Sequence, residues 1–290
     1  GGRYEIVQSE GLLARQGFLA GEDGRRLSEL RWAMSDPHVR AIVCARGGYG
    51  VMRLLPALMQ MAEATAGQDV STAPLVGFSD ITVLHALYAL RQQVTIHGPV
   101  VTQLGELSGA DAESLWAALE DPAPAPAIEG LEPRGGVSGR LRGRLLGGNL
   151  EMLSRLSGTP LSAALAPGGP VVLLIEEVGE VPYRIDRALT QLWLSGMLRS
   201  VVALVVGDLV RCGGPSNSGD GLPDAMGVIA ERSAAFGIPA FFGAPIGHGD
   251  RHRAVALGTA VEIDAGRGTL QFLEGAVQEE RGRTVIGEKG

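Results

Sequence analysis

The chain has 290 residues, of which 45% are hydrophobic and 20% charged, a globular composition with room for two domains or one large one. It carries 25 Lys and Arg against 32 Asp and Glu, a formal net charge of −7, which argues against nucleic acid as a partner. No run approaches the roughly 20 apolar residues of a membrane span, so we expect no membrane partner. Cys44 and Cys212 show no paired spacing, which fits a reducing compartment and predicts a cytoplasmic protein.

The start of the chain is unusual for an α/β protein. Gly1-Gly2-Arg3 lacks an initiator methionine and leads directly into residues 4–7, whose composition predicts a strand. We expect that the sequence has been trimmed or that an opening element, which could be a signal peptide, is missing.

The first 121 residues alternate between predicted helices and strands. Helices are predicted over 23–36, 51–62 and 81–90, and strands over 39–45, 75–76 and 94–96. This alternation predicts an α/β domain, residues 1–121, built on a mostly parallel open sheet with helices on both faces. Ligands of such sheets gather at the carboxyl ends of the strands.

A glycine-rich turn, Arg46-Gly47-Gly48-Tyr49-Gly50, follows the strand predicted over 39–45. It lacks the lysine of a nucleotide-binding P-loop and the third glycine of a dinucleotide-binding loop. The turn is better suited to let a substrate approach the backbone and to hold an oxyanion with its N–H groups.

Ser79 occupies the turn between the strand ending at Gly77 and the helix predicted from Ile81. Such a turn lifts a hydroxyl above the sheet and directs backbone N–H groups at its target. The fit to the nucleophile signature Gly-x-Ser-x-Gly is partial, because Ile81 takes the place of the last glycine. The alternative is that Ser79 only caps the helix.

The proline-alternating stretch 122–127 predicts a stiff linker without core residues, which we place over 122–135. Residues 136–290 predict a second α/β domain with a partly closed sheet. Its predicted strands cover 137–146, 171–175, 201–206 and 240–242, with helices from 150, over 184–194 and over 223–236, and short strands from 254.

A serine nucleophile needs a base, and the base needs an orienting carboxylate. Of the five histidines, His248 lies in a glycine-flanked loop after a strand. His97 also ends a strand, where it could face a cleft or be structural, and His85 is turned away from Ser79 on the following helix. Glu176 or Glu177, at the end of the strand predicted over 171–175, could orient His248.

A metal site is the rival interpretation of the second histidine region. His248, Asp250 and His252 would share one face of an extended strand. The glycine at 249 and the loop context weaken this interpretation, and we predict no metal.

Six ordered motifs resemble those of the LD-carboxypeptidases, serine peptidases of bacterial cell-wall recycling that act on muramoyl tetrapeptides, and the match covers nearly the whole chain. The motifs are Arg46-Gly47-Gly48-Tyr49-Gly50, Gly77-Phe78-Ser79-Asp80, His97-Gly98-Pro99, Gly147-Gly148-Asn149-Leu150, Glu176-Glu177 with Pro182-Tyr183-Arg184-Ile185-Asp186-Arg187, and Gly247-His248-Gly249. One departure is that the strand and helix with which the family opens are absent here.

The resemblance implies a triad of Ser79 as nucleophile, His248 as base and Glu176 as orienting carboxylate. It implies an oxyanion hole formed by the N–H of Asp80 with that of Gly47 or Gly48. It also implies a homodimer without metal or other cofactor.

For the substrate we consider Arg46, Arg184 and Asn149 as binding residues. We favour Arg46 as the anchor of a terminal carboxylate, because the planar guanidinium binds both oxygens. Arg184 could instead pair with Glu180 or Asp186.

The expected activity is a serine carboxypeptidase that releases terminal D-Ala from murein tetrapeptides through an acyl-enzyme, in peptidoglycan recycling. A related hydrolase that cleaves peptide–nucleotide antibiotics of the microcin type stays open. So does a binding protein that uses the same cleft without chemistry.

Overall fold

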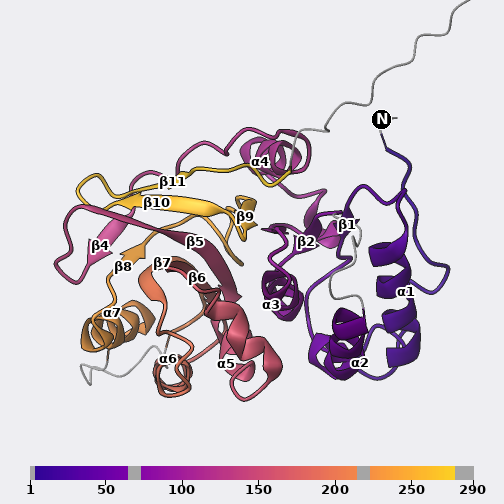
Figure 1. Ribbon diagram of the computed structural model, residues 1–290, viewed down its shortest axis with the longest axis horizontal. Coiled ribbons are helices and arrows are strands. Elements are labelled where there is room, and N and C mark those ends of the chain that lie inside the picture. Colours follow the sequence, from indigo (N-terminus) through magenta and orange to yellow (C-terminus); the bar gives the residue numbers. More distant parts are fainter. Residues whose placement is uncertain (1–3, 65–72, 214–222, 278–290) are drawn as a thin grey trace, which may run out of the picture.

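The protein contains two β-sheets joined by helices, and Figure 1 shows them as two lobes with α3 between them. A computed structural model describes residues 4–64, 73–213 and 223–277. In this part of the chain no helix is long and apolar enough to cross a membrane.

The first sheet has four strands in the order β1-β2-β3-β9. Its elements are α1 (Asp23–Ser35), β1 (Ile42–Val43), α2 (Val51–Ala64), β2 (Leu75–Gly77), the 3₁₀ helix η1 (Ser79–Ile81), α3 (Thr82–Leu90), β3 (Thr95–His97), η2 (Val101–Gln103), α4 (Gly109–Glu120) and β9 (Val255–Leu257). Strands β1, β2 and β3 are parallel, and β9 joins antiparallel to β3 from the far end of the chain.

Alternation along the buried strand β2 places helices on both faces of this sheet. Leu75 packs in the core cluster formed with α2 and α3, whereas the neighbouring Val76 packs with Leu115 of α4. The prediction of a mostly parallel sheet covered on both faces is therefore confirmed.

The second sheet has seven strands in the order β11-β10-β5-β6-β7-β8-β4. Its elements are β4 (Glu132–Arg134), β5 (Arg140–Asn149), α5 (Leu150–Arg155), η3 (Pro160–Leu165), β6 (Val171–Val178), α6 (Pro182–Leu194), β7 (Val201–Val210), α7 (Ala225–Phe236), β8 (Ala240–Phe242), β10 (Ala260–Asp264) and β11 (Thr269–Phe272). The central strands β5 to β8 are parallel, and α5, α6 and α7 pack against one face.

The two edges of this sheet approach each other, as the prediction of a partly closed sheet requires. Ile128, shortly before β4, forms a bridge with Leu270 of β11, and Leu131 N–H donates to Gly268 O at 2.8 Å. Because β4 is the opposite edge strand, this short segment links the last strand of the sheet to the first.

The linker placed over 122–135 contributes core residues beyond its proline-alternating stretch 122–127. Ala125 packs against the second core cluster, Ile128 and Leu131 are buried in it, and Glu132–Arg134 pairs with β8. The proline at position 133 is tolerated because β4 is an edge strand. The segment 122–135 therefore belongs partly to the second sheet.

Two predicted strands at the beginning of the chain also differ from the structure. The strand predicted over 39–45 is reduced to β1, which pairs only with β2 among the described residues. Residues 4–7 form no strand and are exposed, so their strand-like composition does not lead to a strand. Residues 1–3 lie outside the described part of the chain.

Candidate active site

Ser79 forms a strained turn directly after β2. Its φ is +64°, a left-handed conformation that is uncommon for a residue with a side chain. The 3₁₀ helix η1 begins at this residue and leads into α3, and Ser79 is half-buried. This is the strand–turn–helix context that a nucleophile elbow requires.

The glycine turn packs closely on Ser79. A Cβ added at Gly47 would lie 2.9 Å from Ser79 Cβ, so only glycine permits this approach. Asp80 ties the two segments together, because its Oδ2 accepts a hydrogen bond from Val51 N, at the start of α2, at 2.9 Å. Burial raises the pKa of Asp80, and the bond from Val51 opposes that rise.

His248 and Glu176 form a short hydrogen-bonded pair. His248 Nδ1 lies 2.6 Å from Glu176 Oε2, and the carboxyl group is fully buried in β6. Burial alone would raise the pKa of Glu176, but the hydrogen bond from His248 and the nearby His97 imidazole lower it to about 2. An ionised carboxylate can only accept, so Nδ1 carries the hydrogen and Nε2 offers its lone pair.

Asp208 of β7 holds the loop that carries His248. Its Oδ2 accepts a hydrogen bond from Gly249 N at 2.9 Å. Burial raises the pKa of this carboxyl group, and the charge of Glu176 adds to the rise. The sequence reasoning missed this residue, although an acidic residue within a long apolar strand was a usable signal.

Phe78 brings the two halves of the site together. Its ring centroid lies 4.6 Å from that of His248 and 4.4 Å from that of His252. Ser79, the next residue, is thereby placed near the His248–Glu176 pair of the other sheet.

Ser79 Oγ makes no hydrogen bond to any described residue. Catalytic hydrogen bonds are often long before substrate binds.

Glu177 stabilises the start of α5 on the opposite side of β6. It accepts hydrogen bonds from Asn149 Nδ2 at 2.9 Å and from Glu151 N at 2.8 Å, both at the start of α5. Burial raises the pKa of Glu177, and these hydrogen bonds oppose the rise. Of the two adjacent glutamates, Glu176 is the one that reaches His248.

Asn149 connects the second sheet to helix α3. Its N–H donates to Thr82 Oγ1 at 3.0 Å, and its Oδ1 accepts from Met152 N at 3.1 Å. A Cβ at Gly148 would lie 2.5 Å from Thr82 Oγ1, which explains the glycine there. Both ends of the Asn149 amide are bonded within the protein, and its contact with substrate stays a prediction.

The two candidate arginines differ in their surroundings. Arg46 is exposed, and its guanidinium lies over Gly48, within 3.4 Å of where a Cβ would stand. Within the described ranges Arg46 forms no ion pair. Arg184 pairs with Glu180 at 3.6 Å, and its pKa is raised by Tyr183 and Glu180.

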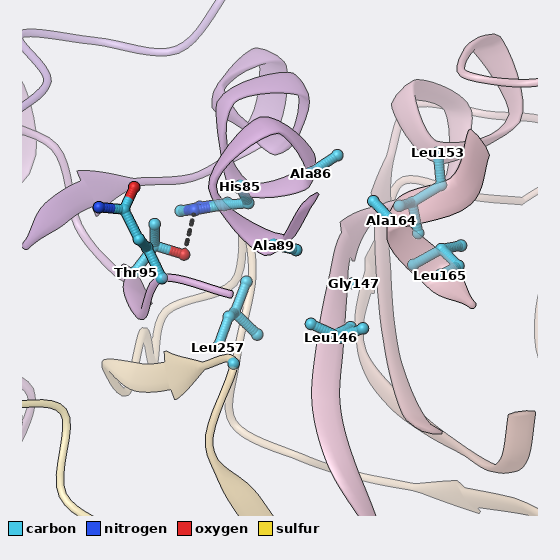
Figure 2. A pocket seen from close by; sticks show the side chains of 12 residues that line it. His85, Ala86, Ala89, Thr95, Leu146, Gly147, Leu153, Ala164, Leu165 and Leu257 are labelled. Atoms are coloured by element: carbon cyan, nitrogen blue, oxygen red, sulfur yellow. Dashed lines mark hydrogen bonds between the residues drawn. The ribbon is translucent and has the colours of Figure 1, made fainter. Parts of the chain in front are cut away.

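His85 is structural rather than catalytic. Its ring bonds Thr95 Oγ1 at 2.8 Å and Gly77 O at 2.9 Å, which anchors α3 to the strand before Ser79. Burial lowers the pKa of His85 to about 3, so the ring is neutral. His85 is among the residues that line an apolar cavity with Leu146, Leu153 and Leu165, and Figure 2 shows its ring pointing toward Thr95.

His248, Asp250 and His252, the ligands of the rival metal interpretation, do not form a metal site. Asp250 is exposed, whereas His252 is buried beside Phe78. Among the residues that the structure describes, no group of three His, Cys, Asp or Glu side chains could hold a metal ion.

Two family models match the two halves of the chain. The LD-carboxypeptidase N-terminal domain matches residues 2–98, and the LD-carboxypeptidase C-terminal domain matches residues 142–263. The chain therefore belongs to the LD-carboxypeptidase family, whose members are peptidases.

Individual relatives agree over most of the chain. A protein of Streptomyces coelicolor named as a carboxypeptidase is 40% identical over 87% of this chain and 78% of its own. The murein tetrapeptide carboxypeptidase of Pseudomonas aeruginosa is 34% identical over 88% of this chain and 82% of its own.

Solved structures share the fold. The muramoyltetrapeptide carboxypeptidase of Oxalobacter formigenes superposes with a TM-score of 0.74 at 26% identity, covering 90% of this chain and 87% of that one. The microcin C7 self-immunity protein MccF, in complex with aspartyl sulfamoyl adenosine, also gives 0.74 at 20% identity over 92% and 86%.

Proposed function

We propose that this protein is a serine carboxypeptidase that releases terminal D-Ala from murein tetrapeptides. The observation that carries the proposal is the His248–Glu176 pair beside the strained Ser79 turn, assembled from two sheets. The similarity to the murein tetrapeptide carboxypeptidase of Pseudomonas aeruginosa supports the substrate class. The proposal includes a cytoplasmic location and a homodimer without cofactor.

The proposed mechanism begins at Ser79. Its Oγ attacks the carbonyl carbon of the L,D-peptide bond while His248 Nε2 takes the hydroxyl proton. Glu176 stabilises the imidazolium, and the N–H groups of Asp80 and of Gly47 or Gly48 bind the oxyanion. The same proton passes to the nitrogen of the departing D-Ala, which leaves an ester on Ser79. Water activated by His248 then hydrolyses the ester.

Substrate specificity tests this function directly. Purified protein is expected to release D-Ala from a murein tetrapeptide and to leave the pentapeptide, which ends in D-Ala-D-Ala, intact. Chromatography with mass detection of the products measures both reactions. Cleavage of a peptide–nucleotide conjugate alone would favour the microcin-type hydrolase. Failure of a serine-directed phosphonate to label the protein would favour a binding protein.

Arg46 is the proposed anchor of the terminal carboxylate, because its guanidinium is exposed beside Gly48 and free of ion pairs within the described ranges. Arg46→Met is expected to raise KM about 10- to 100-fold, the cost of losing a hydrogen-bonded charge partner. Amidation of the substrate's carboxyl terminus should harm the wild type far more than this variant.

Arg184→Met is the matched control, since Arg184 already pairs with Glu180. It should show a nearly unchanged KM and the same sensitivity to amidation as the wild type. If amidation weakens wild type and Arg46→Met by the same factor, Arg46 does not read the carboxylate.

A further inference from the structure

One oxygen of the Glu176 carboxylate is unused by the triad. Oε2 bonds His248, whereas Oε1 is buried without a hydrogen-bond partner among the described residues. A buried charged oxygen left unpaired is costly, so a donor facing it has a clear energetic role.

The nitrogen that faces this oxygen belongs to His97. His97 Nε2 lies 3.9 Å from Glu176 Oε1, and both side chains are fully buried. Neither ring nitrogen of His97 has a hydrogen-bond partner in the described part of the chain. His97 Nε2 is therefore a donor without a partner in the described part of the chain, and it faces Glu176 Oε1, an acceptor that likewise has none.

The position of His97 is fixed by the strand that neighbours Ser79. His97 ends β3 in register with Gly77 of β2, and Gly98 N donates to Gly77 O at 3.1 Å. Its contact with Glu176 thus runs from the sheet that carries Ser79 to the sheet that carries the carboxylate.

Three other rings surround that of His97, and among the described residues only His97 and His248 pair with the Glu176 carboxylate. The rings of Phe78 and His85 lie at 6.0 Å and that of His252 at 5.7 Å, centroid to centroid. Both nitrogens of His85 are already bonded to Thr95 and Gly77.

We infer that His97 is a positioning residue of the triad, which donates Nε2–H to Glu176 Oε1 and holds the carboxylate between two imidazoles. The 3.9 Å separation shortens to a hydrogen bond as the site tightens around substrate. His97 touches no reacting atom; it aligns the carboxylate with His248 and aligns the two sheets with each other. The inference rests on the proposed function.

Three substitutions separate donation from packing. His97→Leu replaces the imidazole with an apolar side chain of similar size and so removes the donor. This variant should lower kcat about 10- to 100-fold with little change in KM. His97→Gln places an amide N–H near the position of Nε2 and should recover most of the rate. His97→Asn, whose amide reaches only the position of Nδ1, should not. Equal rates for Gln and Asn variants that fold like the wild type would overturn the inference.

A double-mutant cycle tests whether His97 acts through Glu176. In a Glu176→Gln background, His97→Leu should cause little further loss in the rate of labelling by a serine-directed phosphonate. His85→Leu is the matched control, since it removes another buried imidazole whose nitrogens bond Thr95 and Gly77 rather than Glu176, and it should act by the same factor in both backgrounds. Full additivity of His97→Leu with Glu176→Gln would contradict the inference.

A spectroscopic measurement keeps this inference separate from the proposed function. The His248 Nδ1 proton, in its 2.6 Å bond with Glu176, should give a downfield proton NMR signal. That signal should shift upfield in His97→Leu and return in His97→Gln, whatever the substrate proves to be. An unchanged signal in His97→Leu would overturn the positioning role, whereas inactivity of the wild type on muropeptides would count only against the proposed substrate.

Discussion

Ser79→Ala is expected to reduce kcat by about 10⁴-fold or more, because the acyl-enzyme route is lost with the hydroxyl group. The variant should fold like the wild type: Ser79 Oγ bonds no described residue, and alanine meets the same backbone strain at a φ of +64° as serine does. The measurements are kcat on the murein tetrapeptide, thermal melting, and mass-detected labelling by a serine-directed phosphonate.

The matched control is Ser28→Ala on α1, where the exposed hydroxyl only bonds Gly24 O of its own helix. It should keep wild-type kcat and label fully. If Ser79→Ala retained activity within about tenfold of wild type, Ser79 would not be the nucleophile, and this result would contradict the proposed serine mechanism.

Local patterns were sufficient to predict this elbow. Leu75 and Val76 form a buried strand, Gly77 ends it, and the apolar spacing from Ile81 indicates a helix, so the turn at Ser79 follows from neighbouring residues alone. The same reasoning placed Glu176 at the end of a parallel strand, where sites gather.

Contacts between distant segments could not be derived in this way. Strand β9 pairs with β3 across about half of the chain, and Ile128 pairs with Leu270, although no local spacing encodes either partner. Short apolar runs indicate a strand but not its neighbour, which tertiary packing decides. The closure of the second sheet was predicted, but the role of the linker in it was not.

The same limit explains the residues that the sequence reasoning misjudged or missed. Asp208 stabilises the His248 loop only because β7 lies beside β6, and Phe78 contacts His248 only because the two sheets meet there. For Asn149, the motif indicated importance, but the bonds to Glu177 and Met152 appear only in the folded chain.

Glu176→Gln should lower kcat by about 10³- to 10⁴-fold, the range seen when the carboxylate of a serine triad becomes an amide. The negative charge that stabilises the imidazolium is lost, and the amide N–H can bond Nδ1, which would leave the hydrogen on the wrong nitrogen of His248. Because the carboxylate has a pKa of about 2, it is ionised throughout the neutral range, so the loss should be present at every pH where the enzyme works.

Stability measured against pH provides a second test of the same group. The pKa of Glu176 falls from 4.5 to about 2 on folding, so its ionised form stabilises the native state fully above about pH 4.5. That contribution should disappear as the pH falls from about 4.5 to about 2. Urea unfolding over this range should show the wild type losing more stability than Glu176→Gln.

Glu177→Gln makes the matched comparison, because it applies the same chemical change at the next position of β6. Glu177 accepts from Asn149 Nδ2 and Glu151 N and has no bond to His248, so its substitution should weaken the start of α5 and lower the melting temperature. Its kcat should fall less than about tenfold. A larger loss of kcat in Glu177→Gln than in Glu176→Gln would mean that the wrong glutamate has been assigned to the triad, since successive residues of a strand face opposite sides and only one can serve His248.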